Sequence, residues 1–206
     1  MEGRDVRSRL IEAATTEFLA RGYGEANVGR IATAAGISKK TVYKYVSSKE
    51  DLLRAVMQDK IVATLPEIGP LDLNEAPRKR LISHLSAFAE LAFSSDGVTS
   101  YRLFMSEGFR FEGMAKLYVG FISSFAIEPL GRDLRAYVDA GRLSLEDPHL
   151  AARMLAAMVF ADPMRDASLG ISETPTADEV RTLIETAVTI FLLGAQSGAK
   201  ATAEGI

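Results

Sequence analysis

The sequence has no cysteine, and only two of its 206 residues are histidines, His84 and His149. Without cysteine the chain can form neither a disulfide nor a thiolate zinc site. The two histidines lie far apart, no carboxylate pair has ligand spacing with either, and Asp133 and Asp139 are interpreted as solvated helix positions. Catalysis needs a nucleophile, an acid–base pair or a metal cluster. We therefore predict that the protein is not an enzyme and holds no metal or cofactor.

Long apolar runs are also missing. No run approaches the ~20 residues that a membrane-spanning helix needs. The first residues, Met1–Asp5, lack the apolar core of a signal peptide. We expect a soluble cytoplasmic protein that contacts no membrane.

The chain as a whole has no excess of positive charge, because its net charge is −3, but basic residues outnumber acidic ones near the start of the chain. Residues 1–60 contain 11 Lys/Arg and 8 Asp/Glu, whereas the remaining residues contain 13 and 19. This distribution is expected if only the N-terminal part of the protein meets phosphate.

Residues 27–53 have the pattern of two short helices joined by a glycine turn and followed by a third helix start. Asn27 can cap a first helix whose apolar face has helical spacing. That face consists of Val28, Ile31, Ala32 and Ala35. Gly36 lies where a helix end takes a positive φ, and Ser38 is a suitable cap for the next helix.

The second short helix begins at Lys39. Successive residues turn by roughly 100°, so Val42 and Val46 share the inward face. Lys40 and Lys44 share the opposite face. A short helix with a cationic outer face fits the major groove of DNA. The alternative is an ordinary helical hairpin whose lysines are solvated.

The third helix start carries a capping box at Ser48 and Asp51, with Ser47 and Glu50 as a competing version. Backbone N–H groups at a helix start attract anions. Together with these groups, Lys49 would suit a phosphate oxygen.

The stretch from Leu10 through Leu53 resembles the DNA-binding domain of the TetR family of bacterial transcriptional regulators. The matching segments are Ile11–Ala14, Phe18, Gly22–Tyr23, Val28, Ile31–Ala32, Ala35–Ser38, Thr41–Tyr43, Tyr45–Val46 and Ser48–Leu52. There are three departures. Lys40 replaces a common small residue, Tyr45 a frequent histidine, and Asn27 the usual Ser or Thr cap.

The resemblance implies binding to double-stranded DNA. The candidates for base edges or nearby phosphates are Lys39, Lys40, Thr41 and Lys44. The candidates for backbone phosphates are Asn27, Ser38, Tyr43, Tyr45 and Lys49. Lysine pairs best with guanine O6 and N7, and the threonine methyl suits a thymine methyl.

The sequence predicts an all-α fold with two domains. A first helix from about residue 5 to 21 should end at the glycines around Tyr23, and the helix from Ser48 should reach about residue 63. Pro66, Gly69 and Pro70 then break the chain. We therefore expect a three-helix helix-turn-helix DNA-binding domain at residues 1–63 and a helical effector-binding and dimerisation domain at residues 71–200.

Five helices are expected in the second domain. They span about residues 74–93 (capped by Asp72 or Asn74), 98–107, 111–137, 148–160 and 177–194. Pro129 should kink or split the third of them. Asp147 with Pro148, and Thr176 with Glu179, mark the starts of the last two.

The last two helices carry apolar residues nearly all round. One explanation is a central place in the core, and the other is a two-fold interface. The resemblance favours an interface, since family members generally dimerise through their two terminal helices. The candidate interface residues are Leu155, Met158, Leu183, Ala187, Ile190 and Phe191. From about Ser83 onward the chain also faintly resembles the AefR-like regulatory domains.

Aromatic side chains are concentrated between Phe88 and Phe125. Ligand pockets are mostly apolar with a few polar groups. The resemblance implies a small-molecule effector there, although a stripe of this kind also suits an ordinary core. The candidate effector residues are His84, Phe88, Tyr101, Arg102, Phe104, Phe121 and Phe125.

These observations predict a homodimeric repressor that a small apolar effector releases from a palindromic operator. Two alternatives remain. One is a regulator of this fold that acts through protein–protein contact without binding DNA. The other is a helical enzyme acting on a hydrophobic small molecule, which the scarcity of catalytic side chains disfavours.

Overall fold

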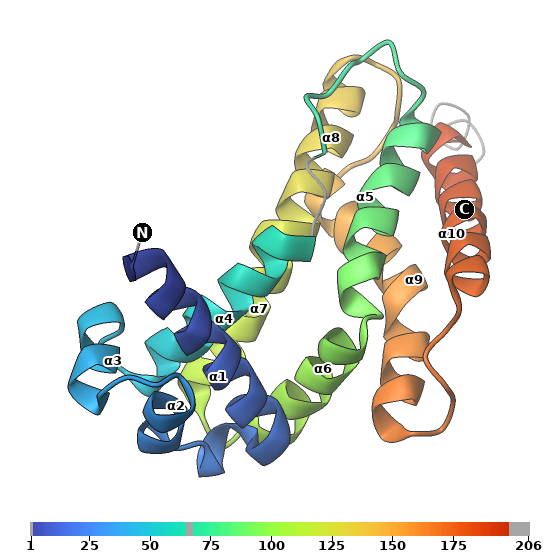
Figure 1. Ribbon diagram of the computed structural model, residues 1–206. Helices are drawn as coiled ribbons and strands as arrows, with labels where there is room; N and C mark the ends of the chain where they lie inside the picture. The colour runs from blue at the N-terminus through green and yellow to red at the C-terminus, as the bar shows by residue number, and fades with distance from the viewer. Residues whose placement is uncertain (1, 65–67, 198–206) are drawn as a thin grey trace. The chain divides into compact units, whose positions relative to one another are not determined.

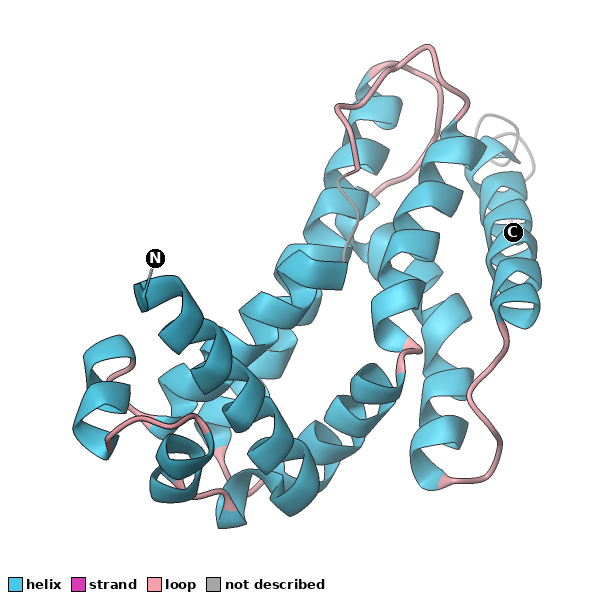
Figure 2. Ribbon diagram, in the orientation of Figure 1, coloured by secondary structure: helices cyan, strands magenta, loops and turns pink. Residues whose placement is uncertain are grey.

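The computed structural model describes residues 2–64 and 68–197, and over these residues all regular structure is helical (Figure 2). Ten α-helices and one π-helical segment occur in this part of the chain (Figure 1). They are α1 (Glu2–Glu25), α2 (Val28–Ala34), α3 (Lys39–Tyr45), α4 (Lys49–Thr64), α5 (Pro77–Ala92), α6 (Ser95–Glu107), α7 (Glu112–Ile122), η1 (Ser123–Ile127), α8 (Glu128–Asp139), α9 (Pro148–Leu169) and α10 (Ala177–Ser197). The predicted all-α fold class is confirmed.

The described residues form two compact units. The first contains residues 2–64 and 95–118, and the second contains residues 68–94 and 119–197. Helix α6, which the sequence placed in the second domain, therefore groups with α1–α4. The division into a first domain that ends at residue 63 and a second domain that begins at residue 71 stays a prediction.

Most of the predicted helix starts are confirmed. Asp147 accepts hydrogen bonds from the backbone N–H groups of His149 (2.9 Å) and Leu150 (3.0 Å), which begins α9. Thr176 and Glu179 form the reciprocal capping box of α10. The Thr176 N–H donates to Glu179 Oε2 (2.8 Å), and the Glu179 N–H donates to Thr176 Oγ1 (3.3 Å).

Two predicted boundaries are wrong. Helix α5 begins at Pro77, and Asp72 instead accepts from the backbone and side-chain N–H groups of Asn74, in a turn before the helix. Helix α9 continues through Pro163 to Leu169 and ends at Gly170, whose φ is 71°. In this last part of α9, after the proline, Met164 and Ala167 are buried. The predicted split near Pro129 is confirmed, because η1 separates α7 from α8.

The core of the second unit is built from α5, η1, α8, α9 and α10. Its fully buried side chains include Leu81, Leu134, Tyr137, Leu155 and Val188. These residues recur at helical spacing on their elements, so each helix turns one apolar face inward.

Three polar side chains, Arg80, His84 and Asp133, are buried beside this core. Arg80 Nε donates to Asp133 Oδ2 at 2.5 Å, and His84 Nε2 lies 2.6 Å from the same oxygen. Arg80 Nη1 also donates to the carbonyl oxygen of Gly69 at 2.8 Å. Burial tends to raise the pKa of Asp133, but the hydrogen bonds from His84 and Arg80 outweigh it and lower that pKa. The interpretation of Asp133 as a solvated position is wrong.

Candidate nucleic-acid interface

The turn between α2 and α3 is closed by its own backbone. Gly36 has a φ of 68° and donates its N–H to the carbonyl of Thr33 (3.1 Å). The N–H of Ile37 reaches back to the carbonyl of Ala32 (3.0 Å). This pair of bonds satisfies carbonyls at the end of α2. Asn27 caps the start of α2, as predicted, by accepting from the N–H groups of Gly29 (2.7 Å) and Arg30 (3.3 Å).

Helix α3 turns one side chain inward and several outward. Ser38 caps it by accepting from the Thr41 N–H at 3.0 Å, and the two hydroxyl oxygens lie 2.8 Å apart. Val42 has no exposed surface and anchors the helix. The predicted DNA-contacting residues Lys39, Lys40, Tyr43, Lys44 and Tyr45 are all exposed, and Thr41 is half-buried. The DNA contacts themselves stay a prediction.

Helix α1 packs against both α4 and α2, and α2 in turn packs against α3. The inner faces of α1 and α4 are buried and apolar, and Ile31 and Ala32 of α2 are also buried. The buried residues of α1 and α4 are Leu10, Ile11, Ala14, Phe18, Leu52, Leu53 and Val56. A rigid base of this kind fixes the direction of the short helix α3.

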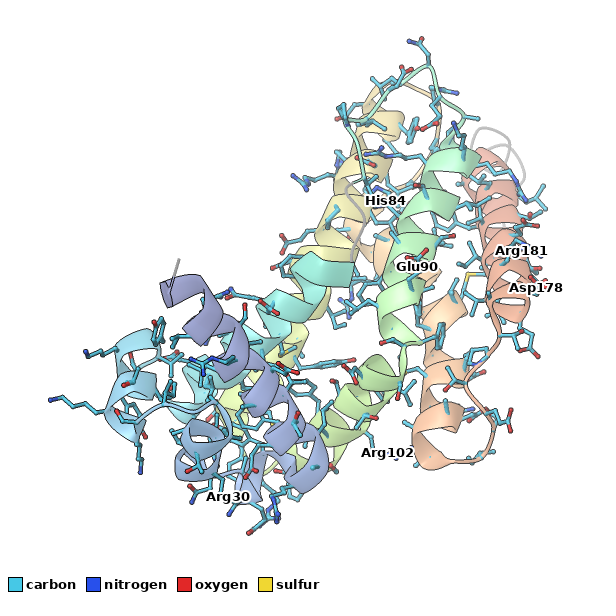
Figure 3. All side chains as sticks on the ribbon, in the orientation of Figure 1. Arg30, His84, Glu90, Arg102, Asp178 and Arg181 are labelled. Carbon is cyan, nitrogen blue, oxygen red and sulfur yellow. The ribbon has the colours of Figure 1, made fainter. Side chains whose placement is uncertain are left out.

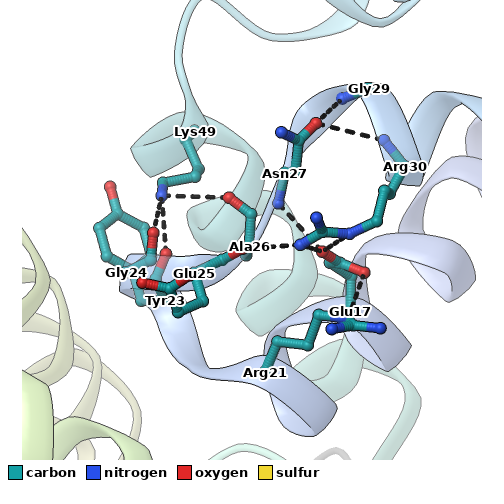
Figure 4. A network of polar contacts seen from close by, with 10 residues as sticks. All are labelled: Glu17, Arg21, Tyr23, Gly24, Glu25, Ala26, Asn27, Gly29, Arg30 and Lys49. Atoms are coloured by element: carbon teal, nitrogen blue, oxygen red, sulfur yellow. Dashed lines mark hydrogen bonds and ion pairs between the residues drawn. The ribbon is translucent and has the colours of Figure 1, made fainter.

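A carboxylate on α1 binds the start of α2 (Figure 4). Glu17 Oε1 accepts from the Asn27 N–H (3.0 Å) and from Arg30 Nε (2.8 Å) and Nη2 (2.5 Å). Arg30 Nη2 also donates to the carbonyl of Glu25 (2.7 Å). The hydrogen bond from Arg30 lowers the pKa of Glu17. Sequence reasoning missed this network, since nothing in the spacing of Glu17 and Arg30 marks them as partners.

Lys49, the first residue of α4, contacts the backbone at the end of α1. Its ammonium donates to the backbone carbonyls of Tyr23 (2.7 Å), Gly24 (3.1 Å) and Ala26 (3.3 Å), and it lies 4.6 Å from the centre of the Tyr23 ring (Figure 4). An ammonium group has three N–H donors, and three protein acceptors take them. The phosphate contact of Lys49 stays a prediction.

The last residues of α1 also contact the end of α6 and the residues just after it, within the first unit. The Gly24 N–H donates to Glu107 Oε2 at 2.6 Å. The Tyr23 ring meets the Phe111 ring edge-on, with centroids 5.1 Å apart, and burial raises the pKa of the Tyr23 phenol. These contacts help to explain why α6 groups with α1–α4.

The predicted effector residues fall in both compact units. In the first unit Phe104 stacks on Tyr118 (4.9 Å between centroids), Tyr101 meets Tyr118 edge-on (6.2 Å), and Arg102 is exposed (Figure 3). Burial raises the pKa of Tyr118.

In the second unit Phe121 stacks on Phe125 at 5.6 Å, and Phe88 meets Phe160 edge-on at 5.1 Å. His84 lies on α5 with its Nε2 engaged by Asp133 (Figure 3). This ring nitrogen therefore contributes to the buried cluster with Arg80.

A shallow groove of about 540 Å³ lies between α9 and α10. Its lining includes four predicted interface residues, Met158, Leu183, Ala187 and Ile190. Met158 and Ile190 are 42% and 56% exposed. Leu155 is fully buried in the core of its own unit, and Phe191 packs partly against that core. The prediction that Leu155 lies at an interface is wrong, because its side chain has no surface left to contact a partner.

No helix within residues 2–64 and 68–197 has both the length and the apolar character needed to cross a bilayer.

Comparison with known proteins gives two family matches. Residues 10–56 match the family model described as bacterial regulatory proteins, tetR family. Residues 79–194 match the model described as AefR-like transcriptional repressor, C-terminal domain. The expected resemblance is therefore confirmed in both parts of the chain.

Individual relatives agree with these matches. The HTH-type transcriptional activator FasR of Mycolicibacterium smegmatis is 34% identical over 104 residues, which cover 45% of this chain and 48% of that protein. An HTH-type transcriptional repressor of Streptomyces coelicolor is 32% identical over 96 residues, covering 44% and 50%. The chain thus spans about half the length of these curated relatives. Among solved structures, the flavonoid-responsive regulator FrrA has 26% identity and a TM-score of 0.77, covering 93% of this chain and 97% of that one.

Proposed function

The chain belongs to the TetR family of bacterial regulatory proteins and is a DNA-binding transcriptional regulator, and we propose that it acts in the cytoplasm as a dimeric repressor released from a palindromic operator by a small apolar effector. The observation that carries the proposal is the outer face of α3. There Lys39, Lys40 and Lys44 are exposed beside Tyr43 and Tyr45, while Val42 is fully buried. A helix anchored by one apolar side chain can enter the major groove with its cationic face leading.

The proposed DNA contacts are of two kinds, to base edges and to phosphates. Lys40 and Lys44 read guanine edges, and the methyl group of Thr41 meets a thymine methyl. Lys39 reaches a base edge or a phosphate beside it. Tyr43, Tyr45, Lys49 and the helix starts capped by Asn27 and Ser38 bind phosphates and set the register without reading sequence.

Dimerisation uses the exposed apolar surface of α9 and α10. Met154, Met158, Ile190 and Leu193 are each more than two-fifths exposed on these two helices. A second copy that covers them by two-fold symmetry removes this surface from water. Two α3 helices then reach half-sites about one helical turn, ~34–36 Å, apart, so the operator is an inverted repeat.

Effector binding is supported by the aromatic pairs of both units and by the name of the flavonoid-responsive relative. The effector acts by its differential affinity for the DNA-binding and released states. Complete switching from 99:1 to 1:99 requires about 5.5 kcal/mol of differential binding, and partial release requires less. Repression is supported by the description of the C-terminal family model and by the name of the Streptomyces coelicolor relative, whereas FasR is named as an activator.

The test is footprinting of the full chain on the DNA upstream of its gene, followed by titration of the protected duplex and a scrambled duplex at two salt concentrations. We expect one protected inverted repeat and tighter binding to it than to the scrambled duplex. Equal affinity for both would remove the repressor assignment. Unchanged regulation after charge reversal at Lys40 and Lys44 would favour action through protein–protein contact.

A further inference from the structure

Glu17 of α1 binds the cap and the first turn of α2 at once. Its Oε1 atom accepts from the backbone N–H of Asn27 at 3.0 Å and from Arg30 Nε and Nη2 at 2.8 and 2.5 Å (Figure 4). The Glu17 side chain is only 12% exposed. Arg30 Nη2 also donates to the carbonyl of Glu25 at 2.7 Å. One carboxylate therefore fastens the start of α2 to α1.

This contact lies on the route by which α3 is held. Helix α3 packs against α2, and α2 packs against α1. Between Glu17 and the start of α2, the backbone leaves its helical path at Gly22, where φ is 76° and ψ is 171°. The helix geometry of α1 is therefore not carried through the backbone into α2, and the side chains of Glu17 and Arg30 bridge the break.

We infer that Glu17 and Arg30 are positioning residues, which set the direction of α2, and through α2 that of α3, for entry into the DNA groove. The inference rests on the proposed function. It assigns to DNA binding a carboxylate that phosphates repel and that contacts no base.

The charge of Glu17 makes this role measurable. The hydrogen bond from Arg30 lowers the pKa of Glu17, so the carboxylate is ionised at neutral pH. On charge alone, removing a carboxylate from a unit that binds a polyanion should tighten DNA binding. The positioning role predicts the opposite result, because α2 would lose its attachment to α1. The two explanations thus differ in the sign of the change in affinity.

Glu17→Ala is compared with Glu12→Ala, an exposed position on the same helix with the same change in charge. Each full-length variant is titrated with the inverted repeat found by footprinting and with sheared genomic duplex, at two salt concentrations. Glu17→Ala should weaken binding to the inverted repeat by about tenfold, the loss expected for one charge-assisted hydrogen bond. Glu12→Ala should bind as tightly as the wild type or more tightly. A Glu17→Ala protein that binds as tightly as Glu12→Ala overturns the inference. A wild-type protein that does not prefer the inverted repeat counts instead against the proposed function.

Glu17→Gln separates the hydrogen bonds from the charge. It removes the same charge as Glu17→Ala but keeps an amide oxygen that can accept from Asn27 and Arg30. Positioning predicts that Glu17→Gln binds the inverted repeat more tightly than Glu17→Ala does, whereas charge alone makes the two equal. Equal affinities contradict the inference. If Glu17→Ala does not fold, as judged by circular dichroism, Glu17→Gln is compared with Glu12→Gln and should bind more weakly.

Arg30→Ala tests whether Glu17 and Arg30 act as a pair. The double variant with Glu17→Ala should lose no more affinity than the weaker-binding single variant, because either change breaks the same attachment. The slope of log affinity against log salt should stay as in the wild type. A phosphate contact by Arg30 would instead reduce that slope by about 0.9 in Arg30→Ala and make the two losses add. That outcome overturns the positioning role.

Discussion

Lys40 and Lys44 lie about one helical turn apart on the exposed side of α3. The family commonly has a small residue at the position of Lys40, so a long cation there adds a donor close to the proposed groove. Glu17 and Lys49, by contrast, are occupied by partners within the protein. The charge of a side chain alone therefore does not decide its role.

Lys40→Ala should relax the base preference at one operator position by about 1–3 kcal/mol, because a lysine donates to guanine O6 and N7. The measurement is competition among duplexes that differ at single base pairs. Lys79→Ala is the control, since Lys79 lies in the second unit and pairs with Glu75 at 2.8 Å. A uniform loss of affinity across all duplexes would assign Lys40 to a phosphate instead.

Asp133→Asn should destabilise the protein by about 3 kcal/mol at neutral pH, since it leaves the buried Arg80 cation without its carboxylate. The pKa of Asp133 is lowered in the folded protein. The stabilisation that the Asp133 carboxylate provides is therefore complete above the pKa of an aspartate in the unfolded chain, about 3.9. It is lost as the pH falls through the lower pKa of Asp133 in the folded protein.

Urea unfolding between pH 7 and pH 2 measures both effects. Asp133→Asn should flatten the acid part of the stability profile. Asp139→Asn, an exposed change on the same helix, should leave stability and its pH dependence close to wild type. An Asp133→Asn profile that keeps the wild-type acid slope would show that another group controls it.

At the scale of elements, Gly36 ends α2 and directs the chain into α3 with a positive φ. Gly141 ends α8 in the same way, with a φ of 69°; its N–H donates to the carbonyl of Val138, and the next N–H, of Arg142, donates to the carbonyl of Tyr137. The two turns share a backbone geometry, but only Gly36 lies in the DNA-binding unit. They therefore form a matched pair of sites for substitution.

Gly36→Ala and Gly141→Ala should each cost about 1–2 kcal/mol of stability, because a side chain strains the left-handed conformation. Only Gly36→Ala should also weaken DNA binding, since it changes the approach of α3. Gly120→Ala, in helix α7 with open space around it, should be neutral or stabilising. Thermal unfolding and duplex titration measure the two properties separately. Equal DNA affinity in the two strained variants would mean that the turn geometry does not matter for binding.

The features that the sequence predicted are local. Asn27, Ser38, Asp147 and Thr176 each cap a helix through neighbours within three residues, so composition and spacing reveal them. The extent of α9 was missed, because a proline inside a helix usually ends it and here it does not.

The features that the sequence missed are long-range. Arg80 and Asp133 are 53 residues apart, and Gly24 and Glu107 are 83 apart. No periodicity connects such pairs. The carbonyl acceptors of Lys49 also come from a distant part of the chain, so the sequence does not reveal them.

For the whole molecule, the proposed dimer depends on the groove between α9 and α10. Met158 and Ile190 line it from opposite sides and are partly exposed. Leu155 and Val188, on the same two helices, are completely buried. Each helix thus has one apolar face for its own core and a second for a partner.

Ile190→Glu together with Met158→Glu should yield a monomer that keeps its helical content, because buried carboxylates would oppose the interface. The monomer should lose most of its affinity for an inverted repeat, since the two half-sites are no longer bound jointly. Light scattering coupled to gel filtration gives the mass. Phe109→Glu is the control, at an 87% exposed phenylalanine of the first unit, and it should remain dimeric. A double variant that also stays dimeric would place the interface elsewhere.

Helix α3 has only seven residues, so its axis is about 10 Å long and can follow about three base pairs. Three base pairs read in each half of an operator make about six specified base pairs in total. A given sequence of six base pairs occurs by chance about once in every 4,000 base pairs. A genome offers at least about a million competing positions. The information needed to find one gene must therefore come partly from the stiffness and groove width of the flanking duplex, which phosphate-binding side chains sense without touching a base.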